Sequence, residues 1–97
     1  MKVTLAAEAE LELVAAAHYY TSQANAALAE AFVLEFERSA RLLGHYPQIG
    51  TRWRGPTRRL PLRRFPFGII YVAHDLELRI VAVAHQSRRP GYWRGRV

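Results

Sequence analysis

The 97-residue sequence contains no cysteine, which excludes disulfide bonds and thiolate catalysis. It also lacks a long apolar run: the longest, residues 65–73, is far shorter than the roughly 20 residues that a membrane-spanning helix requires. Glu8, Glu10 and Glu12 stand where a secretory leader would be apolar. We therefore expect a cytoplasmic protein without a membrane segment.

Tracts rich in proline, glycine or serine are absent as well, and no internal repeat is visible. With 51% hydrophobic and 23% charged residues, the composition is that of an ordinary globular protein. A chain of this length has room for one modest core between two layers of secondary structure. The sequence predicts a single domain over residues 1–97.

Acidic residues are scarce in the second half of the chain, and lysine is missing from it. Residues 51–97 hold eleven arginines against two acidic residues, a net charge of 11 − 2 = +9, whereas residues 1–50 carry 3 − 6 = −3. A GC-rich genome would explain arginine in place of lysine, but it does not explain the clustering. Such clustering indicates a polyanionic or strongly acidic partner.

Three consecutive strands are predicted in this basic half. In residues 58–64, Leu60 and Leu62 fall on one face and Arg59 and Arg63 on the other, the pattern of a half-buried strand, and Pro61 suits an edge strand. Residues 67–73 are apolar on both parities, as in a central strand covered on both sides. After a turn at His74 and Asp75, residues 76–84 form the third strand.

The first half predicts a short strand at residues 2–5, which would join the sheet, followed by two helices. The first helix begins at about Ala7 in a segment of strong helix formers, and glutamates lie in its first turn. Its apolar spacing runs through Leu11, Val14, Ala15 and His18. The second helix runs from about Ala26 to Gly44. Its apolar stripe comprises Ala29, Phe32, Val33, Phe36, Ala40 and Leu43.

The predicted order is therefore β-α-α-β-β-β, an α+β fold. We expect the two helices to form a hairpin, because the turn between them is very short. Their apolar stripes would cover one face of a mainly antiparallel, four-stranded sheet.

Residues suited to catalysis are few. No serine lies in a nucleophile-elbow context, and the basic half has no pair of carboxylates placed for acid and base work. The four histidines are too scattered for a metal-ligand pattern. We predict neither a metal site nor a cofactor.

Among the histidines, only His85 is followed within seven residues by arginines and a tyrosine, namely Arg88, Arg89 and Tyr92. Strict alternation along its strand places it on the exposed face with Glu77 and Arg79. Together with Arg88 and Tyr92 it could cut RNA, supplying a base, a phosphate clamp and a leaving-group acid. The alternative is that His85 satisfies a backbone group at the strand end and transfers no proton.

Tyr92 and Trp93 also have two interpretations. Aromatic side chains among arginines often stack on nucleic-acid bases. They could equally pack the C-terminal tail against the sheet, and we favour this second role.

The chain resembles the RelE/ParE superfamily of bacterial type II toxins, and its ParE branch most closely. The element order carries the resemblance across nearly the whole chain, together with a set of short motifs. These are Ala29-x-x-Phe32, Pro47-x-x-Gly50, Arg64-Phe65-Pro66-Phe67 with Tyr71, His85-x-x-Arg88-x-Pro90, Tyr92-Trp93 and Arg96. The resemblance implies a toxin that is encoded with a small acidic antitoxin and bound by it as a hetero-oligomer.

The two branches imply different targets. ParE-like members are linked to poisoning of DNA gyrase, without catalysis by the toxin, whereas RelE-like members cut messenger RNA in the ribosomal A site. In the gyrase branch the target-binding residues would be Arg88, Arg89, Tyr92, Trp93, Arg94 and Arg96. In the ribonuclease branch the catalytic roles would fall on Arg64, His85, Arg88 and Tyr92. The antitoxin would contact Arg59, Arg63, Arg64 and Phe67.

Three functions remain open at this point: a gyrase inhibitor, a ribosome-dependent ribonuclease, and a basic nucleic-acid-binding module without toxicity. By this resemblance the gyrase branch fits better, because the chain lacks the lysine-rich surface of many ribosome-dependent members. The Arg64-Phe65-Pro66-Phe67 and His85-x-x-Arg88-x-Pro90 segments also resemble the gyrase-directed branch more.

Overall fold

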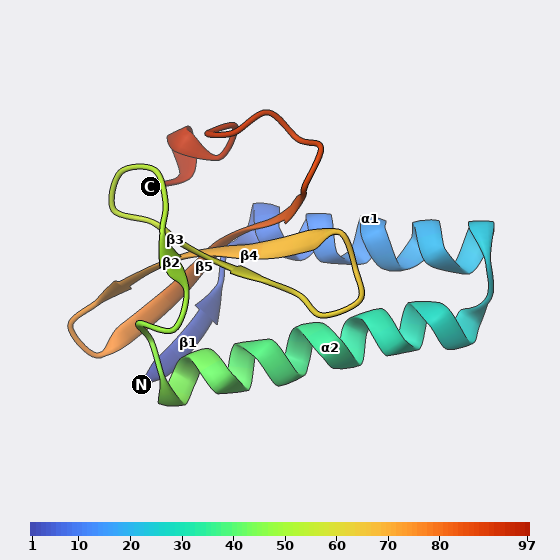
Figure 1. The fold of residues 1–97 in the computed structure, drawn as a ribbon, viewed down its shortest axis with the longest axis horizontal. Helices are drawn as coiled ribbons and strands as arrows, with labels where there is room; N and C mark the ends of the chain where they lie inside the picture. The colour runs from blue at the N-terminus through green and yellow to red at the C-terminus, as the bar shows by residue number, and fades with distance from the viewer.

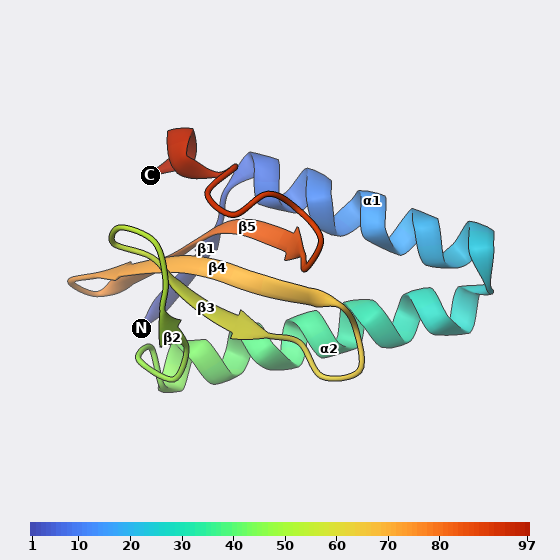
Figure 2. The same cartoon turned by 45° about the horizontal axis from the view of Figure 1, so that its top comes forward.

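The computed structural model describes residues 1–97 and has the predicted α+β architecture (Figure 1). Its elements are β1 (Lys2–Leu5), α1 (Ala7–Gln23), α2 (Ala26–His45), β2 (Thr51–Arg52), β3 (Arg58–Pro61), β4 (Phe67–His74), β5 (Glu77–His85) and a short 3-10 helix (Arg94–Arg96). The two helices form the expected hairpin, and their apolar sides pack on one face of the sheet. The C-terminal tail crosses the other face (Figure 2).

The sheet has five strands rather than the four predicted, in the order β1-β5-β4-β3-β2. β1 runs parallel to β5, and the other neighbouring strands are antiparallel. This confirms that the sheet is mainly antiparallel and that residues 2–5 join it. The additional strand, β2, has only two residues, which pair with Arg59 and Arg58. Two residues are too few to show a period of two in the sequence.

The predicted strand 58–64 is shorter in the structure, because β3 ends at Pro61. β2 rather than β3 forms the outer edge, but it pairs only with the first two residues of β3. Pro61 lies past that pairing, at a position where a missing N–H is tolerated. Residues 62–66 form a loop, in which Arg64 has a φ of 69°.

Helix α2 has the predicted bounds within one residue and the predicted apolar stripe. Asn25 caps its N-terminus, since the Asn25 side chain accepts a hydrogen bond from the Leu28 N–H at 2.8 Å. Phe32 and Leu43 are fully buried in the core. Neither α2 nor α1 is long and apolar enough to span a membrane.

Helix α1 forms where predicted, but its predicted apolar stripe does not face the sheet. Leu11 is 70% exposed and Val14 is 46% exposed. The buried face consists instead of Ala9 and Ala16, with Tyr20 half-buried beside them. α1 carries apolar residues on two sides, so spacing alone fits two orientations, and the structure uses the alanine-rich side for close packing on β5.

The main core lies between the helices and the sheet, and aromatic rings fill one end of it. The ring of Phe32 lies 5.3 Å from that of Phe65 and 5.1 Å from that of Phe67, measured between centroids. A second, smaller cluster lies on the opposite face of the sheet, around Ile70 and Trp93. β4 is thus covered on both faces, as its apolar sequence predicted.

A β-bulge interrupts the pairing of β4 with β5. Ile70 pairs with Ala82 and Tyr71 pairs with Ile80, which leaves Val81 without an opposite residue. An extra residue reverses the alternation of side chains beyond it. Val83 therefore faces the helices, whereas Ala82 faces the tail, opposite to the arrangement that strict alternation predicts.

The Pro47-x-x-Gly50 motif forms a turn that is tied to the central strand. The hydroxyl of Tyr71 donates to the Pro47 carbonyl oxygen at 2.7 Å and accepts from the Gly50 N–H at 3.0 Å. A Cβ atom at Gly50 would lie only 2.7 Å from the Tyr71 hydroxyl oxygen. The close approach of this backbone to the ring therefore requires glycine.

Candidate functional site

The C-terminal tail, residues 86–97, lies on the face of the sheet that the helices leave uncovered (Figure 2). Trp93 is only 4% exposed and packs on Ile70, Val81, Ala82 and Ala84. The packing role that we favoured for Trp93 is therefore confirmed. The ring of Tyr92 lies edge-on to Trp93 at 5.4 Å and is half-buried.

Glu12 on α1 binds this tail to the rest of the fold. Its Oε2 accepts a hydrogen bond from the Tyr92 hydroxyl at 2.6 Å, and its Oε1 accepts one from Arg96 Nη1 at 2.9 Å. The Val83 N–H also donates to Oε1, at 3.0 Å, and Arg96 Nη1 reaches the Val81 carbonyl oxygen at 3.0 Å. The Glu12 side chain is only 16% exposed. One carboxylate thus joins helix, sheet and tail.

The surroundings of Tyr92 disfavour ionisation of its phenol. Burial raises the pKa of the phenol, and the hydrogen bond to Glu12 raises the pKa further, because the carboxylate would repel a phenolate. The guanidinium carbon of Arg88 lies 3.9 Å from the centroid of the Tyr92 ring, within the range of a cation–π contact. Glu12 therefore also fixes the ring on which Arg88 rests.

A groove of about 280 Å³ opens between this tail and the loop that precedes β3. Its lining includes Trp53, Arg59, Arg88, Tyr92 and Trp93. The Arg59 guanidinium lies against Gly68, where a Cβ atom would be 3.0 Å from the guanidinium carbon. The same carbon lies 5.6 Å from the centroid of the Trp53 ring. Of the four residues proposed for a ribonuclease, Arg88 and Tyr92 line the groove, and His85 borders it at the end of β5 with its ring turned to Phe67. Arg64 lies outside the groove, on the β3–β4 loop.

His85 does not share the exposed face with Glu77 and Arg79, and that prediction is wrong. It pairs directly opposite Phe67, and the two rings meet edge to face at 5.0 Å on the helix-covered side. The bulge at Val81 is the cause, since it reverses the alternation between Arg79 and His85.

The ring nitrogen of His85 already has a local partner. Nδ1 accepts a hydrogen bond from the Ser87 N–H at 3.0 Å and lies 2.8 Å from the Ser87 hydroxyl oxygen. This contact supports the alternative in which His85 satisfies a backbone group at the strand end.

The residues predicted to meet an antitoxin do not form one patch. Arg59 lies on the tail side of the sheet, whereas Phe67 packs on the helix side against Phe32. Arg63 and Arg64 are exposed on the loop between β3 and β4. A segment that touches all four residues would have to pass around this end of the sheet.

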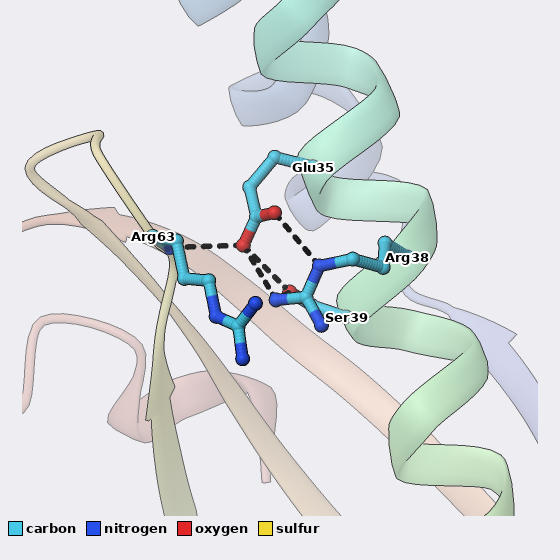
Figure 3. A network of polar contacts seen from close by, with 4 residues as sticks. All are labelled: Glu35, Arg38, Ser39 and Arg63. Carbon is cyan, nitrogen blue, oxygen red and sulfur yellow. Dashed lines mark hydrogen bonds and ion pairs between the residues drawn. The ribbon is translucent and has the colours of Figure 1, made fainter.

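Glu35 on α2 anchors that loop (Figure 3). Its Oε1 accepts a hydrogen bond from Arg38 Nε at 2.9 Å, and its Oε2 accepts one from Arg38 Nη2 at 2.9 Å. Oε2 also accepts from the Arg63 N–H at 2.9 Å and from the Ser39 hydroxyl at 3.2 Å. The hydrogen bond from Arg38 is the main reason why the pKa of Glu35 falls to about 2.

Replacing Glu35 by glutamine should make the free energy of unfolding vary less with pH in the acid range. The folded pKa is about 2 against an ordinary value of 4.5, so ionised Glu35 stabilises the fold above about pH 4.5 and stops doing so as the pH falls towards 2. At pH 7 we expect Glu35→Gln to lose up to about 3 kcal/mol in urea unfolding. The exposed Glu37→Gln is the control. An unchanged difference between parent and variant from pH 7 to pH 2 would contradict this role for Glu35.

Three of the predicted target-binding residues are exposed and three are held in the fold. Tyr92, Trp93 and Arg96 belong to the packing just described, whereas Arg88, Arg89 and Arg94 are exposed and form no ion pair. Sequence reasoning missed Glu12, because in the sequence it is only one of several glutamates in the first helix. No group of three histidine or acidic side chains lies close enough together to hold a metal ion.

Comparison with known proteins agrees with this architecture. The family model described as "ParE toxin of type II toxin-antitoxin system, parDE" matches residues 3–90. Among solved structures, one described as "Chromosomal ParDE TA system from P. aeruginosa" superimposes with a TM-score of 0.77 at 19% identity, covering 88% of this chain and 95% of the other. No curated protein sequence gives a significant match. Because the family model spans most of the sequence, this chain belongs to the ParE toxin family of type II toxin–antitoxin systems.

Proposed function

We propose that this toxin inhibits DNA gyrase by occupying a surface of its target, without catalysing a reaction, and that it thereby blocks replication. The observation that carries the proposal is the state of Tyr92. Its hydroxyl donates to Glu12 at 2.6 Å, and its pKa is raised by burial and by that carboxylate. The proton of this phenol points at Glu12, so it is not directed at a substrate in the groove.

The exposed side chains of the tail are suited to binding. Arg88, Arg89 and Arg94 project from a segment that Trp93 and Glu12 hold against the sheet. A preorganised surface loses less conformational entropy when it binds than a flexible one does. The tail therefore presents these arginines to a partner from a fixed backbone.

A ribosome-dependent ribonuclease is the second candidate, and one observation favours it. Arg88, Tyr92 and Arg59 line one groove, and the strand end that carries His85 borders it. Two contacts argue against His85 and Tyr92 as an acid–base pair: Nδ1 of His85 is engaged by Ser87, and the Tyr92 hydroxyl donates its proton to Glu12.

We further propose that a cognate acidic antitoxin neutralises the toxin in the cytoplasm, as a stable hetero-oligomer. The exposed Arg63 and Arg64 would meet its carboxylates, and apolar contacts would supply the rest of the affinity. Since salt near 0.5 M screens exposed charges within a few ångströms, an interface with an apolar part should survive it in co-purification. Complete separation at that salt concentration would contradict the apolar part.

The gyrase proposal can be tested with purified components. Relaxed plasmid, gyrase and ATP are incubated with increasing toxin, and supercoiling is measured on a gel. We expect inhibition by the parent protein, release of that inhibition by the antitoxin, and weaker inhibition by the double variant Arg88→Ala/Arg89→Ala. Arg41→Ala, which removes an exposed arginine from α2, is the matched control. Undiminished supercoiling at saturating toxin would exclude gyrase as the target.

A further inference from the structure

Four arginines meet at the end of the molecule where the loop before β3 approaches the tail. Arg54 and Arg94 converge over Gly91: a Cβ atom there would lie 3.3 Å from Arg94 Nη2 and 3.6 Å from Arg54 Cδ. Gly91 has a φ of 84°, a conformation that favours glycine. Arg88, Arg89 and Arg94 line a hollow of about 540 Å³, and Arg54 lies beside it, against Gly91. These four residues are called the arginine cluster below.

The cluster has no counter-charge within the chain. All four side chains are exposed, and none forms an ion pair. The nearby carboxylate, Glu12, already accepts hydrogen bonds from Tyr92 and Arg96. Like charges held together repel and disfavour the folded state, so an anion bound among them would relieve that repulsion.

The chemistry of the hollow distinguishes between two kinds of anionic partner. Protein interfaces have apolar cores from which charged residues are depleted. Here Tyr92 is the one large apolar side chain in the lining, its hydroxyl is hydrogen-bonded to Glu12, and Trp93 is buried under the tail. Protein–nucleic-acid interfaces are more polar and far more positive, and the guanidinium fork matches a phosphate group.

We propose that the arginine cluster binds the phosphodiester backbone of duplex DNA. The cluster lies on loops and a short 3-10 helix rather than on a long helix or β-ribbon that could enter the major groove, so we expect contacts with phosphates and binding that is independent of sequence. The choice of duplex DNA over RNA rests on the proposed function, because gyrase acts on duplex DNA. Toxin bound to gyrase would then also hold the DNA.

The test measures DNA binding in the absence of gyrase. Purified full-length toxin is titrated into two fluorescently labelled 20-base-pair duplexes of unrelated sequence, and anisotropy is followed from 50 to 200 mM salt. Contacts with three or four phosphates predict a slope of log K against log salt of about −3, and equal affinity for both duplexes. Arg89→Ala/Arg94→Ala should make the slope shallower by about 2, whereas Arg41→Ala should change neither the slope nor the thermal unfolding.

The outcomes separate this inference from the proposed function. Absence of binding at 50 mM salt, or an identical slope in the double variant, would overturn the inference even if gyrase is inhibited. Binding of single-stranded RNA at least tenfold tighter than the duplexes would overturn the assignment to DNA. Duplex binding with the expected slopes supports the inference. If the toxin binds the duplexes in this way but leaves supercoiling unaffected, only the gyrase proposal is rejected.

Discussion

Phe32→Ala should lower the free energy of unfolding by about 3–5 kcal/mol, a large share of the stability of a domain this small. Phe32 is fully buried, and its ring packs among those of Tyr20, Phe65 and Phe67. Removing it leaves a cavity where α2 meets the β3–β4 loop and β4. Urea unfolding followed by circular dichroism measures the loss.

Leu34→Ala is the matched control for that cavity. Leu34 lies on the same helix but is 56% exposed, so its truncation should change stability by about 0.5 kcal/mol or less. Equal unfolding midpoints for the two variants would show that the aromatic cluster does not support the hairpin.

Glu12→Ala should have the second largest effect, at about 2–4 kcal/mol. It removes the acceptor of the Tyr92, Arg96 and Val83 donors and leaves an arginine partly buried without its counter-ion. The tail would then detach, and trypsin should cut after Arg88, Arg94 and Arg96 far faster than in the parent. Unfolding in urea and the rate of tail cleavage are the two measurements.

Glu10→Ala provides the comparison, because Glu10 is exposed on the same helix and accepts no side-chain hydrogen bond. The cleavage rate in this variant should match that of the parent. If Glu12→Ala and Glu10→Ala behaved alike, the tail would be held by Trp93 alone.

The parts of the fold that could be predicted are those whose apolar pattern fits a single orientation of the helix or strand. α2 carries a single apolar stripe and an Asn25 cap, and β4 is apolar throughout, so both formed where predicted. α1 has apolar residues on two sides, and the choice between them depends on how closely its alanines approach β5, which spacing does not encode. The bulge at Val81 likewise depends on pairing with β4.

The candidate site shows the same division. Clustered charge indicated Arg88, Arg89 and Arg94, and they are exposed. Glu12 was missed because its partners, Tyr92 and Arg96, lie 80 and 84 residues away in the sequence. A contact at that separation leaves no periodic signal.

The gyrase proposal is tested most directly by two conservative variants, His85→Gln and Tyr92→Phe, assayed in parallel for block of gyrase supercoiling and for cleavage of messenger RNA on translating ribosomes. An inhibitor that binds a surface would lose one contact in each variant, generally under about 2 kcal/mol. We therefore predict that both variants retain most of the block of supercoiling and that no messenger RNA is cut. Ribosome-dependent cleavage by the parent that falls by about 10²–10⁴ in either variant would contradict the proposal and identify a ribonuclease.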